Sequence, residues 1–165
     1  MRHMLLGALL WAVSGAVLAQ DLRVSDGWVR EVPPVSANTA AYFTLHNDSG
    51  QPRLLLSAQS AAATAVELHT SEEKDGMSSM RRLERVEVPA NGQVAFRPGG
   101  HHVMLIGLNG PLKQGQEVGL TLTFEGGETL EVALPVKKGA PQADNHHHHH
   151  NWKFGRINLL GRFSC

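Results

Sequence analysis

Cysteine is almost absent from this sequence of 165 residues, and the only one is Cys165 at its end. No intramolecular disulfide can therefore form. A cysteine-rich zinc site and a His-Cys-His copper site for electron transfer are both excluded from the body of the chain, because each needs thiolate ligands. Any metal bound there must be held by other side chains.

An excess of charge of one sign is also lacking. Lys plus Arg and Asp plus Glu each number 15, so the overall balance gives no sign of nucleic-acid binding. Neither a Ser-His-Asp set nor a pair of carboxylates can be argued as a catalytic centre, and a metallohydrolase would need His and carboxylate ligands around an open position. We therefore expect no enzyme.

Convincing helix patterns are missing as well, and the apolar residues fall into short, often alternating runs. Turn signals such as Asn91-Gly92 and Gly126-Gly127 separate most of these runs. Many short strands at nearly even spacing predict a single all-β domain, a sandwich or barrel. The expected strands cover residues 22–29, 40–47, 53–58, 65–70, 80–88, 93–97, 102–108, 117–124 and 129–136.

A domain over residues 20–138 is large enough to bury a core without help from disulfides or metal. We expect the aromatic members of this core to be Trp28, Tyr42, Phe43, Phe96 and Phe124. Arg30, which precedes Pro33-Pro34, is expected in a structural loop; the alternatives are that it lies at the edge of a binding site or docks a partner.

The first 19 residues are expected to be a secretory signal peptide. Arg2 precedes an apolar run from Leu5 to Leu18, and Ala19 marks the cleavage point. The run is too short for a comfortable membrane-spanning helix, so we expect a periplasmic protein without stable membrane insertion, with an uncleaved anchor as the alternative. Because Gln20 rather than cysteine would begin the mature chain, we expect no lipid anchor.

Residues 139–165 are expected to form a flexible C-terminal tail. It carries five consecutive histidines: His146, His147, His148, His149 and His150. Such a tract has affinity for Cu(II), Ni(II) or Zn(II). The tract is either part of a natural tail or a cloning tag. No role is assigned to residues 151–165.

Two methionines and two histidines are the candidate metal ligands. They are His69, Met80, His102 and Met104, in the pattern H-x10-M-x21-H-x-M. Thioether sulfur is a poor ligand for hard cations but suits Cu(I), and imidazole suits several first-row metals, so the set selects reduced copper. His102 and Met104 are two residues apart in an apolar run, and a strand directs both to one face.

Each of these residues also has a purely structural interpretation. A methionine in a β-domain usually packs, and a histidine is more often hydrogen-bonded at the surface than bound to metal. His101 is expected on the face opposite His102, and His46 on a separate strand. Met77 follows a turn at Asp75-Gly76 and is either a loop residue or a substitute ligand.

The pattern resembles that of the periplasmic copper chaperones called PCuAC. Further matches support the resemblance over about residues 21–137: Trp28-Val29-Arg30, Ala40-Ala41-Tyr42-Phe43-Thr44-Leu45, Val66-Glu67-Leu68-His69, Pro98-Gly99-Gly100 and Pro111-Leu112-Lys113. Many members have methionine directly after the first ligand histidine, where this sequence has Thr70. The four-ligand set stays intact, but a possible accessory sulfur is missing.

The resemblance implies a cupredoxin-like Greek-key sandwich or barrel that binds Cu(I) and releases it by ligand exchange. It also implies delivery to the dinuclear copper centre of cytochrome c oxidase, with a Sco-type protein as a second partner. The histidine tract would then hold Cu(II). The alternative is a periplasmic copper or zinc buffer that acts mainly through this tract.

Overall fold

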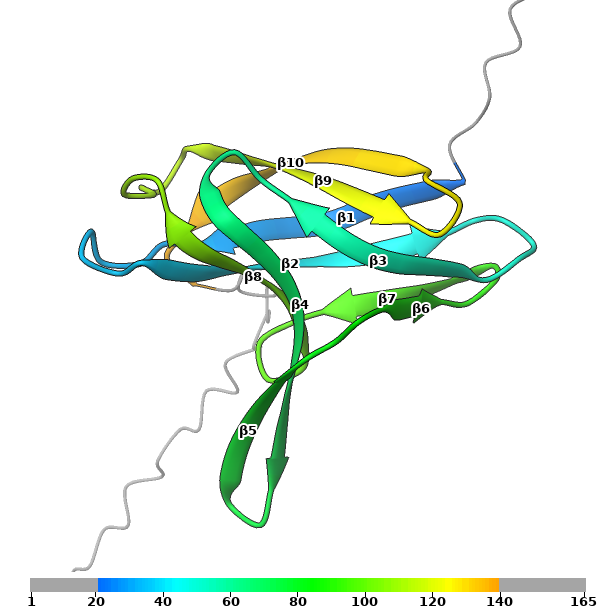
Figure 1. The fold of residues 1–165 in the computed structure, drawn as a ribbon, viewed down its shortest axis with the longest axis horizontal. Helices are drawn as coiled ribbons and strands as arrows, with labels where there is room; N and C mark the ends of the chain where they lie inside the picture. Colours follow the sequence, from blue (N-terminus) through cyan, green and yellow to red (C-terminus); the bar gives the residue numbers. More distant parts are fainter. Residues whose placement is uncertain (1–20, 140–165) are drawn as a thin grey trace, which may run out of the picture.

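The computed structural model describes residues 21–139, and this part of the chain consists of strands, turns and loops (Figure 1). The expectations for the signal peptide and the histidine tract concern residues outside this range. The ten strands are β1 Leu22–Arg30, β2 Asn38–Asn47, β3 Arg53–Gln59, β4 Ala63–Lys74, β5 Met77–Arg82, β6 Val86–Val88, β7 Gly92–Phe96, β8 His101–Leu108, β9 Glu117–Phe124 and β10 Thr129–Lys137. The all-β prediction is confirmed.

The strands form one continuous hydrogen-bonded sheet in the order β5-β4-β8-β7-β2-β1-β10-β9-β3-β6. A parallel pair, β1 with β10, joins its two halves. The first six strands in this order make one layer and the last four make the other. Most neighbours are antiparallel, so side chains that lie opposite each other across a pair share a face of the sheet.

A hydrophobic core fills the space between the two layers. Alternate residues of β2, β8 and β9 point inward, and the rings of Phe43 and Phe96 stack with their centroids 4.6 Å apart. Phe124 joins them from β9. The period of two that the sequence shows in these runs therefore places one side of each strand in the core.

Two of the five predicted core aromatics lie elsewhere. Trp28 and Tyr42 are buried, but they form a small separate cluster with Ala40. Their neighbours Val29 and Phe43 belong to the main core, so alternation directs Trp28 and Tyr42 to the opposite, outer face of the layer. The prediction of burial was right, and the prediction of one aromatic core was wrong.

The single strand expected over residues 80–88 is two strands in different layers. β5 pairs with β4, whereas β6 pairs with β3. The chain crosses between the layers just after β5, where the amide of Leu83 donates to the carbonyl of Leu68 at 2.7 Å. A short apolar run does not reveal such a crossing, because both pieces keep strand character.

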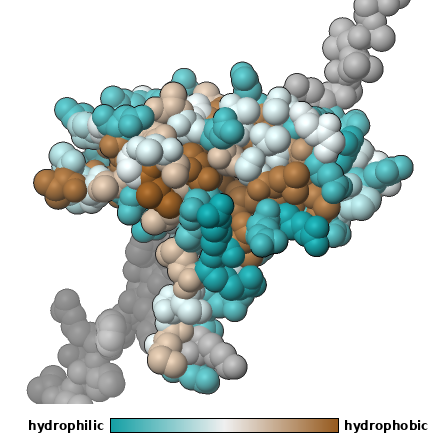
Figure 2. Space-filling model, viewed as in Figure 1, coloured by the Kyte–Doolittle hydropathy of each residue, from teal (hydrophilic) through white to brown (hydrophobic). Residues whose placement is uncertain are grey.

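The β4–β5 hairpin projects from the body of the domain (Figures 1 and 2). Its two-residue turn is Asp75-Gly76, and both residues have positive φ, 54° and 74°. Asp-Gly favours this kind of turn, whose twist matches that of the flanking strands. All six residues of β5 are exposed, and hydrophilic and weakly hydrophobic surfaces lie side by side on the hairpin.

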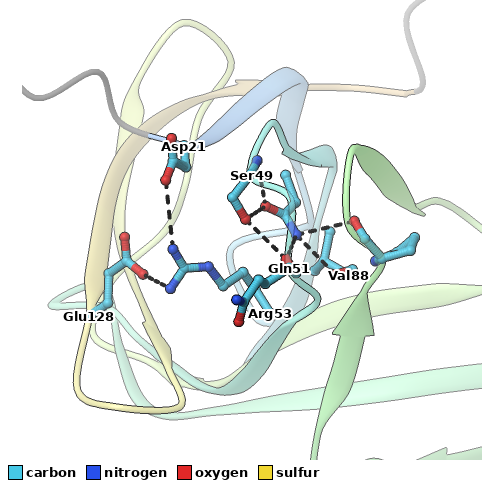
Figure 3. A network of polar contacts seen from close by, with 8 residues as sticks. Asp21, Ser49, Gln51, Arg53, Val88 and Glu128 are labelled. Carbon is cyan, nitrogen blue, oxygen red and sulfur yellow. Dashed lines mark hydrogen bonds and ion pairs between the residues drawn. The ribbon is translucent and has the colours of Figure 1, made fainter.

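A network of polar contacts lies where β2 ends (Figure 3), and the buried Asn47 is part of it. The amide of Asn47 donates to the carbonyls of Gln51, Val88 and Pro89 at 2.7, 3.2 and 3.1 Å. It thereby links β2, the following loop and β6. Two ion pairs of one guanidinium lie nearby: Arg53 with Glu128 at 3.0 Å and with Asp21 at 3.7 Å.

In the part of the chain that the structure describes, no helix is long and apolar enough to cross a membrane.

Candidate metal centre

The pairing of β4 with β8 brings the two candidate histidines together. His69 lies directly opposite His102 in the antiparallel register, and their ring centroids are 5.8 Å apart. The next pair on the same face is Glu67 opposite Met104. Opposite residues of an antiparallel pair share a face, so His69, His102 and Met104 form one group on the outer side of the layer.

The projecting hairpin adds the fourth candidate. Met80 lies opposite Ser71, which is two residues after His69 on β4 and therefore shares its face. The side chain of Met80 is 55% exposed. Met80, His102 and Met104 line one open cleft of about 450 Å³, together with Arg30, Tyr42 and the Pro98-Gly99 loop. The structure thus brings all four predicted ligands onto one surface.

The hydrogen bond of His102 determines which of its nitrogens is available. Nδ1 lies 3.0 Å from the carbonyl oxygen of Gly100. A carbonyl only accepts, so Nδ1 donates and the neutral ring keeps its lone pair on Nε2. This is the arrangement that metal-binding histidines commonly have, with the second nitrogen held by a backbone carbonyl or a carboxylate.

His69 has the reverse arrangement. Its Nε2 lies 2.8 Å from a carboxylate oxygen of Glu67, so the lone pair of the neutral ring is on Nδ1. Nδ1 is buried and has no hydrogen-bond partner within residues 21–139. A buried nitrogen without a partner is unfavourable unless another group, such as a metal ion, uses its lone pair.

Glu67 also pairs with Arg82 of β5 at 2.9 Å through its other oxygen. The hydrogen bond from His69 has the largest effect and holds the pKa of Glu67 below its ordinary value; burial opposes it, and the nearby positive charge of Arg82 adds a smaller lowering of this pKa. The carboxylate therefore stays ionised and accepts from both partners.

An aromatic wall borders the group on the β2 side. The ring centroids of Tyr42 and His102 are 6.4 Å apart, and Trp28 packs against Tyr42 at 4.7 Å. The guanidinium carbon of Arg30 lies 5.6 Å from the centre of the Tyr42 ring, within range of a cation–π interaction. Arg30 therefore edges the cleft, which was the alternative rather than the favoured interpretation of this residue.

Within residues 21–139, the structure leaves the remaining candidates, Met77, His46 and His101, outside the group. Met77 lies beside the hairpin turn, opposite Lys74, and alternation directs it to the other side of the ribbon from Met80. His46 Nε2 is 2.8 Å from the hydroxyl of Ser25. His101 alternates to the face opposite His102, as expected, and packs near Phe96.

The position of Thr70 shows that a methionine at this point of the chain would not be an accessory ligand. Thr70 follows His69 on β4, lies opposite His101 and is buried. Position 70 therefore belongs to the face that points away from the four ligands. The side chain of a methionine at position 70 would leave the strand on the side away from the ligands, so threonine at this position does not remove a donor from the metal site.

Sequence reasoning missed two groups that hold the imidazoles, Glu67 and the carbonyl of Gly100. Glu67 carries a signal, because it precedes His69 by two residues and so shares its face on a strand. The backbone carbonyl carries none. Among the described residues, no three His, Cys, Asp or Glu side chains are grouped to hold a metal. Half of the donors in the candidate site are instead the thioethers of Met80 and Met104, and thioethers suit a soft metal ion.

The protein is thus a single cupredoxin-like domain. Its two β-layers carry imidazole and thioether side chains together on one outer face. The family model described as "Putative lipoprotein LpqE-like" matches residues 22–136, and the chain belongs to this family. One relative, "Putative lipoprotein Lxx21020" of Leifsonia xyli subsp. xyli, is 34% identical over 129 residues, which are 78% of this chain and 76% of the relative.

Solved structures agree with the family assignment and with the resemblance to PCuAC domains. The solution structure of CuI-DR1885 from Deinococcus radiodurans is 40% identical, with a TM-score of 0.61 over 76% of this chain and 84% of that one. A copper-bound PCuAC domain from PmoF2 shares the fold at 21% identity, with a TM-score of 0.62 over 73% of this chain and 95% of the domain. The predicted cupredoxin-like fold is confirmed.

Proposed function

We propose that this protein is a periplasmic copper(I) metallochaperone whose folded site consists of His69, Met80, His102 and Met104. The observation that carries the proposal is the placement of His69 opposite His102 in the β4–β8 register, with both thioethers on the same face. Two imidazole and two thioether donors favour Cu(I) over harder ions. The 40% identical relative is a Cu(I) form, which supports the same ion here.

The site suits a carrier that must also release its cargo. Met80 is more than half exposed and comes from the projecting hairpin, so an incoming ligand can replace its sulfur without opening the core. The buried ring of His102 and the half-buried Met104 keep the ion bound until that exchange occurs. Because the ion is cargo, we propose transfer without catalytic turnover.

By family resemblance, we propose the dinuclear copper centre of cytochrome c oxidase as the destination and a Sco-type protein as a second partner. The test of this step is copper transfer from the loaded protein to the purified, copper-free oxidase subunit. Formation of the absorption spectrum of the dinuclear centre is the expected result. Copper that stays on the loaded protein, or arrives no faster than from free Cu(I), would refute the destination.

The binding test is an anaerobic Cu(I) competition titration of the full chain. Its two variants are His102→Ala and a chain in which all five tract histidines, 146–150, are replaced by asparagine. We expect one tightly held Cu(I) in the wild type, retained in the asparagine variant and strongly weakened in His102→Ala. If Cu(I) binding were instead retained in His102→Ala and lost in the asparagine variant, the protein would be a copper or zinc buffer that acts through the tract.

A further inference from the structure

One carboxylate lies between a ligand histidine and the hairpin that carries a ligand methionine. Glu67 Oε2 is 2.8 Å from His69 Nε2, and Glu67 Oε1 is 2.9 Å from an Nη of Arg82. The Glu67 side chain is only 24% exposed, although it is ionised. A charged group in this position is stabilised by its two partners, and each of its oxygens is used by one of them.

The strand geometry explains why one residue reaches both partners. Glu67 and His69 are two residues apart on β4, so they share the outer face. Arg82 lies opposite His69 in the β4–β5 pairing, and Met104 lies opposite Glu67 in the β4–β8 pairing. The carboxylate is therefore next to the four ligands without being one of them.

The hydrogen bond to Glu67 determines the proton position on His69. A carboxylate has no proton to donate, so Nε2 of His69 carries the proton and Nδ1 carries the lone pair. That Nδ1 is one of three buried side-chain nitrogens without a hydrogen-bond partner in the described part of the chain, and the other two, Arg53 Nε and His101 Nδ1, do not belong to the ligand group. His102 is held in the opposite sense by the carbonyl of Gly100, which leaves its Nε2 free.

The second oxygen of Glu67 acts on the hairpin. Arg82 is two residues after Met80 on β5, so the Glu67–Arg82 contact ties the methionine-bearing strand to the strand of His69. Arg82 is largely exposed, and such a pair adds little stability by itself. The Glu67–Arg82 contact acts instead on the position of β5, because it connects β5 to β4 at the base of a hairpin that otherwise projects into solvent.

We propose that Glu67 is a positioning residue of the metal site: it fixes His69 so that Nδ1 binds the ion while Nε2 remains protonated, and it anchors β5 through Arg82. This inference rests on the proposed function. Side chains that orient ligand histidines in this way commonly change metal affinity by about 10–100-fold when they are removed. The two imidazoles therefore bind Cu(I) through different nitrogens, Nδ1 of His69 and Nε2 of His102.

The first test is ¹⁵N NMR of the histidine rings in the full-length wild type, before and after anaerobic addition of Cu(I), which is diamagnetic. We expect His69 to retain its Nε2 proton in both states and its Nδ1 resonance to shift on binding. His102 should show the reverse, with the shift at Nε2. A shift at Nε2 of His69 would overturn the proposal, and no variant is needed for this readout.

The second test compares Cu(I) affinity in full-length Glu67→Ala, Glu67→Gln and Glu72→Ala at constant pH. Glu72 is the matched control, because it is also on β4 and pairs with the adjacent Arg81 at 3.2 Å, away from His69. We expect a loss of about 10–100-fold for Glu67→Ala and no change beyond about twofold for the control. Glu67→Gln keeps an acceptor for Nε2, so it should recover part of the loss.

The outcomes separate this inference from the proposed function. Tight Cu(I) binding by the wild type with equal affinity in Glu67→Ala would overturn the role of Glu67 alone. A wild type that binds no Cu(I) at the folded site would refute both. The histidine tract is common to all variants, so differences between them report on the folded domain.

Discussion

Met104→Leu should separate metal binding from folding. Leucine has nearly the volume of methionine but no sulfur, so it removes one proposed donor and keeps the packing. Its neighbour Leu105 provides the opposite case, since it points into the core on the other side of β8. We expect Met104→Leu to lose Cu(I) affinity with little loss of stability, and Leu105→Ala to do the reverse.

The burial of the two residues determines the expected magnitudes. Leu105 is 0% exposed, so its truncation removes core contacts and leaves a cavity, at about 2–5 kcal/mol in the free energy of unfolding. For a domain of this size that is roughly 10–20 °C in Tm. Met104 is half-buried, and a volume-conserving exchange there costs less than about 1.5 kcal/mol. Loss of a direct ligand should exceed the roughly 10–100-fold effect typical of supporting residues.

The assays are thermal unfolding of the metal-free proteins and anaerobic Cu(I) competition at neutral pH. Each variant is measured beside the wild type in both assays, so the two effects are compared directly. If Met104→Leu unfolded as easily as Leu105→Ala while binding Cu(I) like the wild type, Met104 would be a packing residue. The assignment of the outer face of β8 as the ligand face would then be wrong.

Four further predictions follow from the same geometry. Met80→Leu should weaken Cu(I) binding, whereas Met77→Leu, at a 73% exposed position on the other side of the ribbon, should leave the competition titration unchanged. Cu(I) affinity should fall as the pH is lowered from about 7.5 to 5, since imidazole must be neutral to bind; a flat profile would exclude histidine ligands. Burial, with smaller effects of nearby charges, lowers the pKa of His101 below its ordinary 6.5. As the pH falls, His101 is therefore protonated in the unfolded chain at a higher pH than in the folded domain. The metal-free protein should therefore lose stability below about pH 6.5, and His101→Gln should reduce this loss in urea unfolding; an unchanged pH dependence would contradict it. Asn47→Ala removes the side-chain donor to three carbonyls, of which that of Gln51 keeps the hydroxyl of Ser49 as a donor, and should cost about 1–3 kcal/mol in the same assay, while a neutral result would mean that water replaces the amide.

Much of the fold could be predicted because its signals are local. Alternation of apolar residues, as in β9 and β10, marks strands, and Gly126-Gly127 turns the chain with positive φ at both glycines. The same periodicity placed His102 and Met104 on one face and His101 on the other. Local signals fail where the chain changes layers, which is why residues 80–88 were predicted as one strand.

The chemistry of the site can be derived from the amino-acid sequence: which donors are present, the absence of thiolates from residues 1–164, and the sharing of a face by residues two apart. The position of His69 opposite His102, the place of Trp28 and Tyr42 outside the main core, and the hydrogen bond from His69 to Glu67 are known from the folded domain. The difference arises because the alternation of side chains along a strand follows from the local backbone conformation. Register depends on contacts between segments far apart in the chain, and packing of the whole core selects among them.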